Sequence, residues 1–165
     1  MRLPVYDEGR GAGRRCGPCS ACCVALQVEE VPRAEFERCP HLRRGRGGCG
    51  IYADRPGPCR EWRCLWLRGV GQARDRPDKL GVVLDVEWSE PLLAHVVKVF
   101  EVRPGAAKTP RVQNLVHALG EAGPEVVVVV ARPGGRRAIL GGTPAALERA
   151  DAVLSRDPRV GPART

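Results

Sequence analysis

The chain has 165 residues, about the length of one domain, with eight cysteines and 27 basic against 19 acidic side chains. Its longest apolar run, Val126–Ala131, is far shorter than the roughly 20 residues that cross a bilayer, which excludes a membrane-spanning helix. No apolar segment of the signal-peptide kind follows Met1, so we expect a cytoplasmic protein. In that reducing compartment, clustered cysteines indicate metal binding rather than disulfides.

The net charge of +8 does not by itself predict nucleic-acid binding. Most of the basic residues are arginines, a bias more typical of genomic composition than of a binding surface. Residues 1–68 contain every cysteine, and metal-bound thiolates would cancel most of the positive excess there. Nucleic-acid recognition needs a clustered basic face, so we expect no nucleic-acid partner.

The composition divides the chain into four segments. Residues 1–15, where glycines alternate with arginines, are predicted to be a flexible lead-in. Residues 16–68 hold all the cysteines and are predicted to form the metal-binding module. A connecting loop leads to residues 80–156, which lack cysteine and are predicted to form an α+β half, and residues 157–165 form a tail.

Regular structure in the cysteine-rich segment is predicted to be short. Val24, Leu26 and Val28 are two residues apart from one another, as they would be on one face of a strand over 24–28. A short helix is expected over 32–38. Trp62 and Trp66 are four residues apart, so they are predicted to lie on one helix after Cys59 and to form an apolar cover over the metal.

Longer elements are predicted in the second half, in the order β-β-α-β-β-α. They are strands at 81–87 and 92–102, a helix at 110–119, strands at 125–131 and 137–140, and a helix capped by Thr143. The valine run of the third strand is typical of a central strand buried on both faces. The predicted fold class is therefore α+β, with an irregular cysteine-rich metal-bound N-terminal module packed on a small β-β-α-β-β-α layer.

The cysteines are the strongest functional signal. Four of them form a C-x2-C-x2-C-C run, in which Gly17-Pro18 supplies a turn that lets two thiols face one ion. The two adjacent cysteines of the run are expected to point in different directions, so that one of them serves a different metal or sits in the core. We assign eight candidate metal ligands: Cys16, Cys19, Cys22, Cys23, Cys39, Cys49, Cys59 and Cys64.

Spacing alone leaves the metal open. Eight thiolates would fill two tetrahedral zinc sites of four ligands each. Alternatively, the first three cysteines reproduce the C-x2-C-x2-C run of bacterial iron–sulfur proteins, and Cys39-Pro40 would supply a remote fourth ligand. That pattern favours an iron–sulfur cluster slightly over zinc. Cys22 or Cys64 could instead be a cysteine that does not bind metal. His41 is expected to lie outside the ligand set, because eight sulfurs already fill two sites.

Together these motifs resemble the YkgJ-type CxxCxxCC cysteine-cluster family, described as zinc- or iron-chelating domains. The matching strings are C-x2-C-x2-C-C from residue 16, Cys39-Pro40-His41-Leu42, and Cys49-x-Ile51-Tyr52-x2-Arg55-Pro56-x2-Cys59-Arg60. They cover residues 16–66, and the resemblance implies metal chelation by these cysteines without implying a reaction. Similar clusters accompany flagellin lysine methylation in much longer proteins, whose activity we do not transfer to this chain.

Two classes of function follow from the cysteines. In the first, the metal is structural and the protein is a binding or adaptor module. In the second, an iron–sulfur centre serves a redox enzyme or an electron-transfer or accessory protein. The sequence contains no G-x-S-x-G, HExxH, P-loop or Rossmann motif, so we assign no catalytic residue. The expected partners are a metal ion and a protein of unknown identity.

Overall fold

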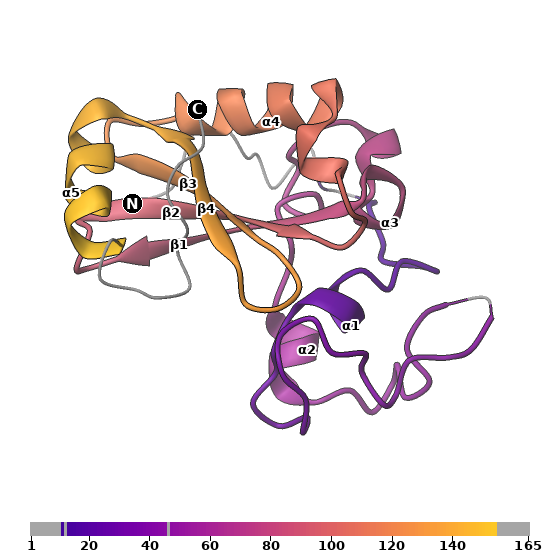
Figure 1. Cartoon of the computed structure of the whole chain (residues 1–165). Coiled ribbons are helices and arrows are strands. Elements are labelled where there is room, and N and C mark those ends of the chain that lie inside the picture. Colours follow the sequence, from indigo (N-terminus) through magenta and orange to yellow (C-terminus); the bar gives the residue numbers. More distant parts are fainter. Residues whose placement is uncertain (1–10, 12, 46, 155–165) are drawn as a thin grey trace.

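The computed structural model describes residues 11, 13–45 and 47–154. Within them, a four-stranded sheet is flanked by helices, and the cysteine-rich segment lies beside it (Figure 1). The strands are β1 (Val82–Ser89), β2 (Ala94–Glu101), β3 (Val126–Ala131) and β4 (Arg137–Gly142). The helices are α1 (Cys22–Ala25), α2 (Gly57–Glu61), α3 (Pro77–Leu80), α4 (Pro110–Gly120) and α5 (Pro144–Leu154), with 3-10 turns η1 (Ala73–Asp75) and η2 (Ala106–Lys108).

The sheet has the strand order β1-β2-β3-β4 and is mixed. β1 and β2 form an antiparallel hairpin, β2 and β3 are parallel, and β3 and β4 are antiparallel with an irregularity between Val128 and Val129. α4 provides the crossover that two parallel neighbours require. The predicted α+β class and the order β-β-α-β-β-α are confirmed, and all six residues of β3 are buried, as expected of a central strand.

The two faces of the sheet pack against different parts of the chain. Alternate strand residues such as Val82, Leu84 and Val128 face α4 and form the largest apolar cluster. On the opposite face, Val127 and Val129 pack against α5. The remainder of that face, at residues including Val83 and Phe100, packs against the cysteine-rich segment. The cysteine-rich segment therefore covers part of the sheet in the way that a helix covers the rest.

Two backbone predictions in the cysteine-rich segment were wrong. The expected strand over 24–28 is absent from the described structure, because α1 occupies its first residues and only an isolated bridge joins Val28 to Val31. The expected helix over 32–38 is a set of turns. Phe36 there has a φ of 63°, which a right-handed helix cannot accommodate, and its amide donates to Ala25.

The predicted helix shared by Trp62 and Trp66 was also wrong. α2 ends at Glu61, and Trp62 has extended backbone angles. Both indole N–H groups donate outside any helix, Trp62 to the Asp85 carboxylate at 3.1 Å and Trp66 to the Gln72 carbonyl at 3.0 Å. These hydrogen bonds to residues farther along the chain, rather than the four-residue spacing, determine where the two tryptophans lie.

Both ends of the chain lie mostly outside the described residues. The predicted tail over 157–165 lies entirely outside them, as does most of the lead-in over 1–15. Of that lead-in, Arg14 is held in place, because its guanidinium donates to the carbonyls of Trp66, Val70 and Gly71. Thr143 precedes α5, and its hydroxyl accepts a hydrogen bond from Val126 N–H.

Asp75 joins the connecting loop to α4. Its buried carboxylate accepts hydrogen bonds from Gln72 N–H at 2.6 Å and from the Arg111 guanidinium. The hydrogen bond from Arg111 is the main reason that the pKa of Asp75 lies below its usual value. A carboxyl with a lowered pKa stabilises the fold above its unfolded pKa of about 4, and this stabilisation is lost as pH falls through the lower folded pKa.

We therefore expect Asp75→Asn to lower the free energy of unfolding by about 1 to 2 kcal/mol at pH 7 and to weaken its dependence on pH below about 4. Urea unfolding between pH 7 and pH 3 measures both effects. Asp151→Asn, at an exposed position, is the matched control. An unchanged acid dependence in Asp75→Asn would show that the pair with Arg111 does not stabilise the folded chain.

Candidate metal centre

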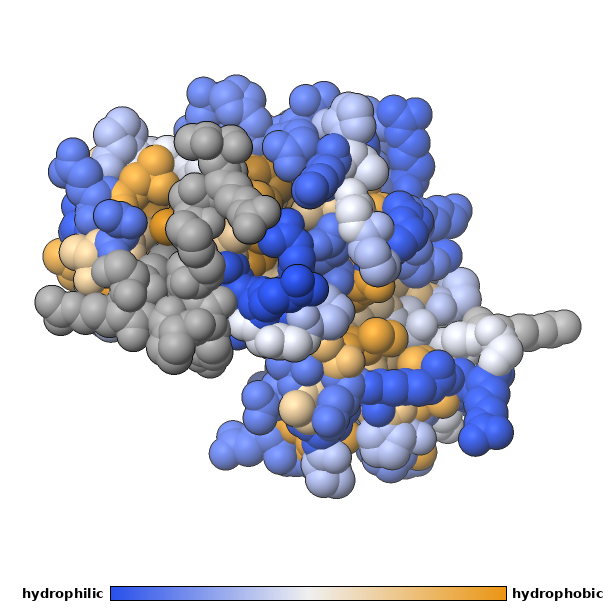
Figure 2. Space-filling model, viewed as in Figure 1, coloured by the Kyte–Doolittle hydropathy of each residue, from blue (hydrophilic) through white to orange (hydrophobic). Residues whose placement is uncertain are grey.

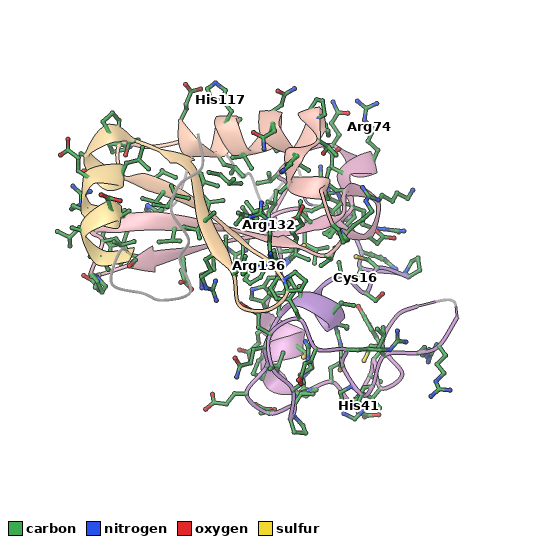
Figure 3. All side chains as sticks on the ribbon, in the orientation of Figure 1. Cys16, His41, Arg74, His117, Arg132 and Arg136 are labelled. Carbon is green, nitrogen blue, oxygen red and sulfur yellow. The ribbon has the colours of Figure 1, made fainter. Side chains whose placement is uncertain are left out.

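All eight cysteine side chains line one cavity of about 480 Å³ between the cysteine-rich segment and the sheet. The sheet side of this cavity is formed by Val83 and Asp85 of β1 and by Lys98 and Phe100 of β2. Figure 3 shows Cys16 near the junction with the sheet and His41 on the far side of the segment. The chain thus brings thiols from a stretch of almost fifty residues to the lining of a single cavity.

The first four cysteines are positioned by a turn and a short helix. Cys19 N–H donates to the Cys16 carbonyl at 2.8 Å, and Gly17 between them has a φ of 52°, a left-handed conformation that favours glycine. α1 begins at Cys22, so Cys22 and Cys23 are successive helical residues. The Cys22 thiol donates a hydrogen bond to the Cys23 sulfur.

Backbone contacts gather the later cysteines. Cys39 N–H donates to the Cys23 carbonyl at 2.9 Å, and a β-bridge pairs Leu42 with Cys49. Arg55 donates to the Cys59 carbonyl at 3.3 Å and to the Tyr52 carbonyl at 2.8 Å, so it caps a turn. Cys64 is anchored to the sheet through the next residue, whose amide donates to β1.

Burial controls the ionisation of these thiols. It raises the pKa of Cys16, Cys19 and Cys59, and it raises that of Cys64 to about 11. Buried thiols with a raised pKa remain protonated at pH 7 unless a cation offsets their charge. Metal binding at this site would therefore release protons.

Cys23 differs from the other thiols. The hydrogen bond with Cys22 lowers the pKa of Cys23 to about 7 and raises that of Cys22, with a smaller contribution from the Arg33 charge. One thiol of the adjacent pair is therefore already close to ionisation before any cation arrives.

Arg33 is a site residue that sequence reasoning missed. Its side chain is 9% exposed and lines the cavity, and it donates to the carbonyls of Cys22 and Cys23 at 3.1 Å each. Its Nε is buried and has no acceptor within the described part of the chain. A single arginine in an arginine-rich chain gives no local signal, because only the tertiary fold buries it.

The two tryptophans lie at the same cavity as the thiols, although not on the helix expected for them. Trp62 and Trp66 both line the cavity beside the thiols, and Trp66 is buried. Arg14 lies over the Trp66 ring, 5.2 Å from its centroid. Figure 2 shows hydrophobic residues reaching the surface along the cysteine-rich segment, between the hydrophilic side chains that surround it.

The donor set fits a thiolate-bound metal in its chemistry. All eight cysteines are described, and none forms a disulfide. The described residues contain no group of three or more Cys, His, Asp or Glu side chains already arranged around a metal position. Ligation therefore requires the thiols that line the cavity to draw together around the ion.

Comparisons of the chain with family models, with curated proteins and with solved structures find no match. The resemblance to the YkgJ-type family thus stands on the cysteine motifs alone. Over the residues that the structure describes, no helix has the length and apolar character needed to cross a membrane.

Proposed function

We propose that this protein binds metal through the thiolates of its eight cysteines, either as zinc ions or as an iron–sulfur centre. The observation that carries the proposal is the convergence of all eight free thiols on one cavity. Thiolates are soft ligands that suit both zinc and iron–sulfur clusters. Free thiols in this number also favour a reducing compartment such as the cytoplasm.

The surrounding residues are suited to holding such a group. Trp62, Trp66 and Phe100 give the cavity apolar walls that limit access of water. Arg33 and Arg55 place two positive charges among the thiols, and these offset part of the negative charge of bound thiolates. Zinc there would hold the segment together, whereas an iron–sulfur centre would add one-electron chemistry.

The structural role is our first candidate, with the protein acting as a binding or adaptor module. The redox role, as an enzyme or an electron-transfer or accessory protein, is the second. It is favoured by the C-x2-C-x2-C spacing and by a cavity with room for more than a single ion. The identity of the metal separates the two, because zinc has no redox chemistry.

Anaerobic purification of the full chain, followed by elemental analysis and an absorption spectrum, tests the proposal. We expect stoichiometric metal, with a colourless protein for zinc or a brown, reducible one for an iron–sulfur centre. Replacing Cys16, Cys19, Cys39 and Cys49 together by serine should abolish metal binding. A wild-type chain without stoichiometric metal, or a quadruple variant that retains it, would overturn the proposal.

A further inference from the structure

We infer that the eight thiols form two separate centres of four sulfurs each, and that the chain passes from one to the other between Cys22 and Cys23. This inference rests on the proposed metal-binding function. Centre I consists of Cys16, Cys19, Cys22 and Cys64. Centre II consists of Cys23, Cys39, Cys49 and Cys59.

The packing of the cysteines already separates the two sets. Cys16, Cys19 and Cys64 belong to the apolar cluster that packs against the sheet at Val83 and Phe100. Cys23 and Cys39 belong to a different cluster, formed with Val28, Val31 and Leu42. Three cysteines of centre I thus pack with the sheet, whereas two cysteines of centre II pack within the cysteine-rich segment itself.

The helix α1 lies between these two clusters. Ala21 and Ala25, four residues apart and so on one face of the helical turn, pack in the cluster against the sheet. Cys23 and Val24 pack in the other cluster. Successive residues of a helix are turned by about 100°, so neighbouring cysteines on this turn can serve different centres.

The electrostatic neighbours of each thiol agree with the packing. Cys22 interacts most strongly with its chain neighbour Cys23. Beyond that neighbour, the thiols that act on Cys22 are Cys16 and Cys19, which also act on Cys64, and this assigns Cys22 to centre I. Contacts between the sets involve Cys23, which neighbours Cys16 and Cys22, as expected of the residue at the boundary.

Centre II has its own electrostatic and backbone connections. Cys59 interacts with Cys23, Cys39 and Cys49, the three other members of the set. Backbone contacts within the set join Cys39 N–H to the Cys23 carbonyl and bridge Leu42 to Cys49. The four thiols of centre II therefore form one neighbourhood, and its interactions with centre I run through Cys23, which lies close to both Cys16 and Cys22.

Arg33 marks the boundary independently. Its guanidinium donates to the carbonyls of Cys22 and Cys23, and its buried Nε has no acceptor within the described residues. Its charge acts on Cys23 and Cys59, both of centre II. Four thiolates around a divalent ion carry a net negative charge, so Arg33 is placed to compensate centre II in particular.

Metal counting on paired variants of the full chain tests this division. Native mass spectrometry of cobalt-loaded Cys19→Ser/Cys64→Ser and Cys39→Ser/Cys49→Ser chains should each show half the wild-type cobalt. The mixed pair Cys19→Ser/Cys49→Ser, with the same number of substitutions, should lose both centres. This pattern of cobalt content is expected if centres I and II share no cysteine. Loss of all cobalt from either matched pair, or full retention of a centre in the mixed pair, contradicts it.

A second readout uses the unmodified chain and so does not depend on a variant that folds. Cobalt ions that share bridging thiolates couple their spins, whereas cobalt in separate centres does not. We therefore expect the electron paramagnetic resonance signal of the loaded wild-type chain to account for two uncoupled high-spin ions. A largely spin-silent sample with the same cobalt content would mean one shared cluster. A chain that takes up neither cobalt nor an iron–sulfur cluster would instead contradict the proposed function itself.

Discussion

Removal of metal with a chelator is expected to unfold the chain from Cys16 to about Arg63 while the sheet, α4 and α5 remain folded. Apart from its packing against the sheet, the cysteine-rich segment has little else to hold it together. Its own apolar cluster is small, and its helices α1 and α2 have four and five residues, far below the length at which a helix is stable alone. Structural zinc contributes on the order of 10 kcal/mol to modules of this size.

The expected boundary follows from packing rather than from the last cysteine. Leu65 is fully buried in the cluster beneath α4, and its amide donates to the Leu84 carbonyl at 2.9 Å. Residues from Leu65 onwards should therefore keep their structure with the sheet. The strands β1 to β3 have a valine-rich core of their own that includes no cysteine.

Amide hydrogen exchange with and without chelator measures this outcome. Protection of Cys39 and Leu42 amides, which donate to backbone carbonyls within the segment, should disappear with the metal. Protection across Val126–Ala131 should persist and serves as the internal control. Equal protection of both regions in the metal-free chain would show that the cysteines do not hold the segment together.

Leu119→Ala is expected to lower the free energy of unfolding of the sheet half by about 3 kcal/mol. Leu119 lies on α4, is 1% exposed, and packs in the cluster that contains Val126 and Val128. Truncation to alanine leaves a cavity that the surrounding strands cannot fill without losing their own contacts.

Leu93→Ala is the matched control, because it removes the same atoms from a side chain that is 55% exposed. It should change the stability by less than about 0.5 kcal/mol. Urea unfolding of both variants, with metal present, gives the comparison, and the metal content of the folded chains should be unchanged. Similar losses in the two variants would mean that α4 does not cover the main core.

The elements that sequence patterns predicted correctly are those with a persistent period. The continuous valines of β3 and the helical stripe of α4 are long enough for burial to determine their backbone. The alternation over 24–28 failed because α1 is a single turn between two clusters, and it is the tertiary packing of Ala25 and Val24 on opposite sides that fixes its conformation.

The sequence predicted which thiols make up the candidate site but not how they are arranged. The C-x2-C-x2-C-C run singles out the cysteines as a group, and all of them line the cavity. Adjacency predicted that Cys22 and Cys23 diverge, but spacing could not say which of the other cysteines lie near each of them, since that depends on the packing of the folded chain. Arg33 was missed for the same reason, because its position among the thiols is set by carbonyls that only the folded chain presents.

X-ray absorption at the edge of the bound metal tests the central claim most directly. If the thiolates hold the metal, the first coordination shell consists of sulfur alone, four atoms at about 2.3 Å for zinc. An iron–sulfur centre gives a sulfur shell together with an iron–iron contact. A first shell made of nitrogen or oxygen atoms, in a chain purified without oxygen, would contradict the claim that these eight cysteines form the metal site.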